Sequence, residues 1–172
     1  CPSDGQAGKD HLNSYFGSFG TGTDPWSTNT NGAFAPKQTS YGVADITDGT
    51  SNTISHTEAL VGDYANKGAR WRRMASGVPG AVPDDMRVRD ARSILPRVVQ
   101  YAQTCMQTIA TTPGDNSNKG LAWATGSPGL TLTNIIFPPN SNEYSFSTCR
   151  WDCASTCGAD FGHIHISSSN HP

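Results

Sequence analysis

Five cysteines constrain this chain more than any other feature: Cys1, Cys105, Cys149, Cys153 and Cys157. Three of them lie within nine residues of one another. In a cytosolic protein such a cluster indicates a metal site, whereas in an exported protein it indicates disulfides. The chain is rich in Gly, Ser, Thr and Asn, and only 15% of its residues are charged. Because this composition is typical of exported surface proteins, we favour disulfides.

Sequence alone does not fix which cysteines pair. We expect one disulfide between Cys105 and Cys149 and a second between Cys153 and Cys157. The odd count leaves Cys1 without a partner among the residues of this chain.

A metal site is the alternative reading of the same region. Cys153 and Cys157, together with His163 and His165, have spacings that zinc sites use. His163 and His165 also lie two residues apart, which places both imidazoles on one side of a strand. Two such groups can hold a metal, although outward-facing polar residues give the same pattern.

One segment carries a clear helical pattern. Apolar residues recur at intervals of three and four across 84–110, which predicts an amphipathic helix. Asp84 or Asp85 is placed to cap its start. Pro96 lies inside the pattern, so we expect a kink or two short helices.

The remaining segments favour short strands joined by turns. We expect strands within 1–35, which glycines and aromatic residues punctuate, and at 53–59 and 69–74. Apolar runs predict further strands within 121–137 and 143–166. These patterns predict a β-rich α+β fold.

A polar turn offers oxygen ligands around Gly49. Asp45, Asp48 and Asn52 are the side chains that could bind calcium there. Their spacing is not that of an EF-hand. Side chains of these types also hold turns by bonding to local backbone, and we weigh that role above calcium.

No catalytic or nucleic-acid signature stands out. The sequence has no Gly-x-Ser-x-Gly, His-Glu-x-x-His or P-loop motif, and we expect no enzyme. A net charge of −2 gives no reason to expect a nucleic acid or an anionic membrane as partner. The apolar runs are all shorter than the roughly 18 residues that a membrane span needs.

Four blocks, taken in order, resemble a known family. They are residues 1–4 (Cys-Pro-Ser-Asp), 31–34 (Asn-Gly-Ala-Phe), 46–53 (Ile-Thr-Asp-Gly-Thr-Ser-Asn-Thr) and 138–141 (Pro-Pro-Asn-Ser). The chain is similar to exported planctomycete proteins with prepilin-type N-terminal signals, a family of unknown function. Residues 169–172 (Ser-Asn-His-Pro) resemble the opening of that family's His-x9-Asp-Gly signature.

The resemblance implies a pilin-like, or pseudopilin-like, globular head formed by residues 1–172 as a single domain. It also implies that a hydrophobic N-terminal helix and a C-terminal strand lie outside this chain. Cys1 is then expected to pair with a cysteine upstream. A membrane would be met only through that helix.

These expectations lead to three functional hypotheses. The first is an exported structural subunit of a filament or cell-envelope assembly, at the cell surface, outside the cell or in the periplasm, that self-associates and binds no cofactor. The second is a surface module that binds glycans or another ligand. The third is a metal-site protein. The ligand-binding hypothesis uses four tryptophans: Trp26, Trp71, Trp123 and Trp151.

Overall fold

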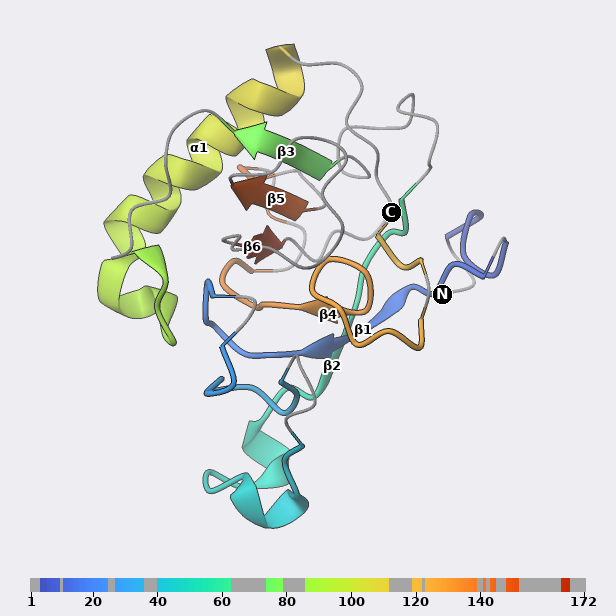
Figure 1. The fold of residues 1–172 in the computed structure, drawn as a ribbon, viewed down its shortest axis with the longest axis vertical. Helices are drawn as coiled ribbons and strands as arrows, with labels where there is room; N and C mark the ends of the chain where they lie inside the picture. The colour runs from blue at the N-terminus through green and yellow to red at the C-terminus, as the bar shows by residue number, and fades with distance from the viewer. Residues whose placement is uncertain are drawn as a thin grey trace.

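The computed structural model describes a small α+β domain, which confirms the α+β class expected from the sequence (Figure 1). Its described part contains one α-helix and two three-stranded sheets. The described residues are 4–9, 11–24, 27–35, 40–62, 74–78, 86–111, 119–121, 123–138, 141, 143–144, 148–151 and 165–167.

The first sheet has the strand order β2-β1-β4. The central strand β1 (Tyr15–Ser18) pairs antiparallel with β2 (His56–Glu58) and parallel with β4 (Leu132–Thr133). Phe16 is fully buried while its neighbour Tyr15 is 52% exposed. This difference follows from the alternation of side chains between the two faces of a strand.

The second sheet has the strand order β3-β5-β6. The central strand β5 (Thr148–Trp151) pairs parallel with β3 (Met74–Val78) and antiparallel with β6 (His165–Ser167). The helix α1 (Leu95–Thr111) lies alongside β3 at one side of this sheet (Figure 1).

The helix begins later than the sequence pattern predicts. A 3₁₀ turn, η5 (Ala91–Ile94), precedes α1, and Pro96 is the second residue of α1. Proline is tolerated in the first turn because the N–H groups there have no partner within the helix. Pro96 therefore marks the start of the helix and does not kink its interior.

Asp90 caps the 3₁₀ turn that leads into α1. The Asp90 carboxylate accepts a hydrogen bond from the backbone N–H of Arg92 and so caps η5. Asp84 and Asp85, the caps proposed from the sequence, lie outside the described residues.

The apolar face of α1 forms the core against the second sheet. Val98, Ala102 and Cys105 are all fully buried on that face. A disulfide joins Cys105 to Cys149 of β5, with a Cα–Cα distance of 5.9 Å. The other buried members of this core are Met86, Ala91, Phe137 and Tyr144.

Each segment in which we expected a strand contains described strand residues. β1 lies within 1–35 and β2 within 53–59. Of the strand expected at 69–74, only Met74 is described, and it is the first described residue of β3. Within 121–137, β4 contributes just two residues. The segment 143–166 contains β5.

Candidate functional site

A loop with two short 3₁₀ turns, η1 (Val43–Asp45) and η2 (Thr50–Asn52), forms one wall of a pocket. The two turns project away from both sheets, at the bottom of the view in Figure 1. Gly49 precedes η2 with a φ of 84°. This left-handed conformation favours glycine, and it explains why the sequence has Asp-Gly here.

The side chains of this loop bind its own backbone. The Asp45 carboxylate accepts a hydrogen bond from the Gly42 N–H at 2.7 Å. The Asn52 amide donates to the Asp48 carbonyl at 2.9 Å, and the Thr53 hydroxyl donates to the Gly49 carbonyl at 3.2 Å. Hydrogen bonds of this kind hold a turn, which is the role that we favoured over calcium binding for these side chains.

The opposite wall depends on a close approach of two glycines. A Cβ added to Gly32 would overlap the backbone of Phe19 and Gly20. The Asn31 side chain fixes this approach with two hydrogen bonds to Thr21. Its Oδ1 accepts from the Thr21 backbone N–H at 2.8 Å, and its Nδ2 donates to the Thr21 hydroxyl at 2.7 Å. Glycine is therefore required at position 32 by close backbone contact, and asparagine is favoured at position 31 by its hydrogen bonds.

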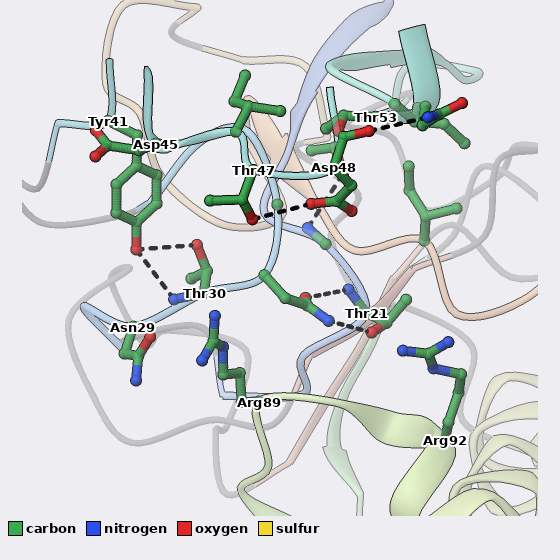
Figure 2. Close-up of a pocket in the computed structure, with 18 residues that line it drawn as sticks. Thr21, Asn29, Thr30, Tyr41, Asp45, Thr47, Asp48, Thr53, Arg89 and Arg92 are labelled. Atoms are coloured by element: carbon green, nitrogen blue, oxygen red, sulfur yellow. Dashed lines mark hydrogen bonds between the residues drawn. The ribbon is translucent and has the colours of Figure 1, made fainter. Parts of the chain in front are cut away.

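Tyr41 connects the two walls. Its hydroxyl donates to the Thr28 carbonyl at 2.8 Å and accepts from the Thr30 N–H at 3.2 Å. The Thr30 hydroxyl in turn donates to the Phe34 carbonyl at 2.9 Å. These bonds hold the tyrosine ring in a fixed position at the side of the pocket (Figure 2).

Arg92, one of the residues that line the pocket, forms an ion pair with Asp90. The Arg92 guanidinium donates to both oxygens of Asp90: its Nε–H donates to Oδ1 at 3.0 Å, and an Nη2–H donates to Oδ2 at 2.6 Å. Asp90 also accepts from the Thr21 hydroxyl at 2.9 Å. Hydrogen bonds from Arg92 lower the pKa of Asp90 to about 2. Asp90 raises the pKa of Arg92, so both groups are charged at neutral pH.

The pocket between these walls has a volume of about 570 Å³ (Figure 2). This volume lies within the range of small-molecule sites, about 300–1,000 Å³. Most of its described lining is polar: six side chains end in a hydroxyl and three in an amide. Its charged lining residues are Asp45, Asp48, Arg89 and Arg92.

Only three of the metal ligands proposed from the sequence have described side chains. Asp45, Asp48 and Asn52 all line the pocket. Within the described ranges, no three His, Cys, Asp or Glu side chains are close enough to hold a metal ion together. His165 lies in β6, but its side chain is outside the described part, as is the whole of His163.

Of the four tryptophans proposed as a glycan surface, only Trp123 has a described side chain. Trp123 is 67% exposed, and it is absent from the pocket wall. Trp151 belongs to β5, and its side chain is not described. Trp26 and Trp71 lie outside the described residues.

The disulfide between Cys105 and Cys149 is the pairing expected from the sequence. Cys1, Cys153 and Cys157 lie outside the described residues, so the expected pair of Cys153 with Cys157 stays a prediction.

Lys119 is a buried titratable group outside the pocket lining, and no sequence pattern pointed to it. Its side chain is 1% exposed, and its Nζ lies 5.0 Å from the centroid of the Phe16 ring. Burial lowers the pKa of Lys119 to about 7. The lysine therefore titrates near neutral pH.

The pocket also contains residues that sequence reasoning missed. Arg89, Arg92 and Asn29 come from segments that carry no recognised motif. The Asp-Gly turn at 48–49 was the available signal, because it marks the loop that forms one wall.

A family model described as "Protein of unknown function (DUF1559)" matches residues 1–154. The chain belongs to this family. No curated protein and no solved structure matches the chain. In the part of the chain that the structure describes, no helix has the length and apolar character to cross a membrane.

Proposed function

We propose that this chain is the head domain of an exported, pilin-like structural subunit. In this proposal the subunit assembles with copies of itself into an extracellular filament or a cell-envelope structure, and it carries out no catalysis. The proposal also places the chain in a planctomycete group of this family. Members of that group have a prepilin-type signal, an upstream hydrophobic helix and a downstream His-x9-Asp-Gly signature.

The disulfide between Cys105 and Cys149 is the observation that supports export. It joins α1 to the central strand of the second sheet, and both cysteines are fully buried. Disulfides of this kind form and persist outside the reducing cytosol. A covalent link across the core also suits a domain that must stay folded at the cell surface.

The proposed assembly follows from the physical chemistry of an amphipathic subunit. A hydrophobic helix preceding residue 1 would pack against copies of itself, and the polar head would face outward. The head has few charges and many hydroxyl and amide side chains. Such a surface is compatible with close packing of identical heads, because it avoids strong repulsion between like charges.

The test follows the full-length gene product in its native cells. Cell fractionation and thiol labelling should place an oxidised protein in the envelope or medium, and crosslinking of intact cells should give ladders of multimers. A variant carrying Cys105→Ala and Cys149→Ala is the control for labelling of the oxidised pair. A reduced, monomeric protein confined to the cytosol would refute the proposal.

A second candidate function is supported by the polar pocket: binding of a surface glycan or another small ligand. A concave site with convergent polar groups is the usual form of a small-molecule site. This function is compatible with the first, since an exposed head can carry a binding site.

A further inference from the structure

We infer that the polar pocket binds a neutral saccharide between a donor wall and an acceptor wall. This inference rests on the second proposed function and names its ligand class. The donor wall consists of Arg89 and Asn29, and the acceptor wall consists of Asp45 and Asp48.

The donor wall has hydrogen-bonding capacity to spare. The Arg89 guanidinium and the Asn29 amide make no hydrogen bond to any other residue in the described ranges. Both side chains lie on the same side of the pocket in Figure 2. Arg92 differs from Arg89, because its guanidinium is already committed to Asp90.

The acceptor wall also keeps free lone pairs. One Asp45 oxygen accepts from the Gly42 N–H, which leaves the other oxygen without a partner among the described residues. Asp48 receives only a long contact from the Thr47 hydroxyl, at 3.4 Å. A carboxylate has about four lone-pair sites, so both aspartates can accept further bonds from a ligand.

The surrounding polar groups are already satisfied, so they act as a rigid frame. Thr21 and Asn31 bind each other, and the Tyr41 hydroxyl is fixed by two backbone bonds from the facing wall. Groups held in this way lose little conformational entropy when a ligand binds. The free groups on the two walls are therefore presented in a preorganised site.

Charge selects among the ligand classes that such a site can hold. When Asp90 is counted with the four charged lining residues, carboxylates outnumber guanidinium groups by one. An anionic ligand would gain from Arg89 but would be repelled by Asp45 and Asp48. A sugar hydroxyl can accept from Arg89 and donate to a carboxylate, so a neutral polyhydroxylated ligand satisfies both walls without repulsion.

The pocket also offers apolar surface for the C–H face of a sugar ring. Tyr41 contributes the only aromatic ring among the described lining residues, and Ile46 and Ile54 lie on the same projecting loop. Ile54 is 57% exposed, so its apolar surface is accessible to a ligand. A mixture of polar anchors and a small apolar face matches the two kinds of surface on a pyranose.

The experiment screens the purified protein against an immobilised array of neutral and acidic glycans, with free amino acids tested separately by calorimetry. We expect neutral glycans to bind, and we expect saturation-transfer NMR to detect the best of them in solution. Arg89→Gln and Asp48→Asn should each weaken that binding about tenfold, because each removes charge-assisted hydrogen bonds. Lys9→Gln, which removes an exposed charge outside the pocket, is the matched control and should change nothing.

The outcomes separate this inference from the function on which it rests. Binding of acidic glycans or amino acids alone, weakened by Arg89→Gln, would overturn the neutral saccharide but keep the ligand-binding function. Neutral glycans that bind both pocket variants as tightly as the wild type would overturn the assignment of the site. Absence of binding to every probe would overturn both. Thermal unfolding of each variant verifies that the substitutions leave the fold intact.

Discussion

Replacing both Cys105 and Cys149 by alanine should remove a large part of the stability of this domain. The two cysteines are 44 positions apart in the sequence. In the chain-entropy model, closing a loop of that length in the unfolded state stabilises the folded state by about 4 kcal/mol. Both side chains are fully buried, so losing two sulfur atoms adds about 1 kcal/mol for the small cavity that remains.

A loss of this size is severe because domains are stable by only about 5–15 kcal/mol. Urea unfolding followed by tryptophan fluorescence measures it, with and without a reducing agent. The double variant should show a lower midpoint than the wild type. Reduction of the wild type should remove a similar amount of stability.

The matched control is Cys153→Ala with Cys157→Ala, which removes two cysteines while leaving the buried pair intact. The shorter loop between those positions predicts a smaller loss, about 2 kcal/mol if they are joined. If the Cys105 and Cys149 double variant loses less than about 1 kcal/mol with an unchanged denaturant slope, the entropic argument is wrong for this bond.

Three further predictions concern titration and backbone packing. Asp90 has its pKa lowered to about 2 by Arg92, so its stabilising effect should be complete above pH 4 and lost as the pH falls towards 2. Asp90→Asn should therefore lower the urea midpoint at neutral pH but match the wild type near pH 2. Lys119 binds fewer protons when folded, between its folded pKa of about 7 and its ordinary value of 10.5. The unfolding free energy should therefore rise with pH across that interval, and Lys119→Met should flatten the rise. Gly32→Ala should cost at least about 2 kcal/mol by overlapping backbone atoms, measured by urea unfolding, whereas Gly5→Ala meets no atom within 4 Å and should stay within about 0.5 kcal/mol.

Each of these predictions has a result that contradicts it. A wild-type midpoint that does not fall between pH 4 and pH 2 faster than that of Asp90→Asn would remove the role of the ion pair. An unchanged pH slope in Lys119→Met would assign the alkaline gain in stability to other groups. A fully stable Gly32→Ala protein would show that the backbone segments at Gly20 and Gly32 can move apart without cost.

The sequence predicted the elements that local chemistry determines. Apolar residues at helical spacing predicted a helix across 84–110, and Cys105 lies on the buried face of that helix, where the disulfide forms. The Asp-Gly pair at 48–49 marked a turn, and the turn exists with Gly49 in a left-handed conformation. Both signals lie within a few residues of the feature that they determine.

The start of α1 and the position of β4 could not be predicted, each for a physical reason. Pro96 is compatible with the first turn of a helix or with a kinked interior, and the apolar spacing continues on both sides of it. β4 has only two residues, Leu132 and Thr133, so no alternating pattern can reveal it. Its position depends on pairing with β1, which is distant in the sequence.

The pocket was beyond sequence reasoning because it combines four separate segments. Its walls come from 18–32, 41–54, 89–92 and Ile135. No local sequence pattern predicts that Arg89 and Asp48 line the same pocket. The tryptophans drew attention as a ligand surface, yet the described site relies on amide, hydroxyl and charged groups.

The parallel pairing of β1 with β4 has a consequence for how this chain acquires its fold. Gly17 pairs with Leu132, so the first strand cannot complete its sheet until most of the polypeptide has been synthesised. Contacts between such distant positions slow folding, because a long loop must close before they form. The pairing of β1 with β4 therefore predicts that this domain folds more slowly than a helical domain of similar size, whose contacts are local.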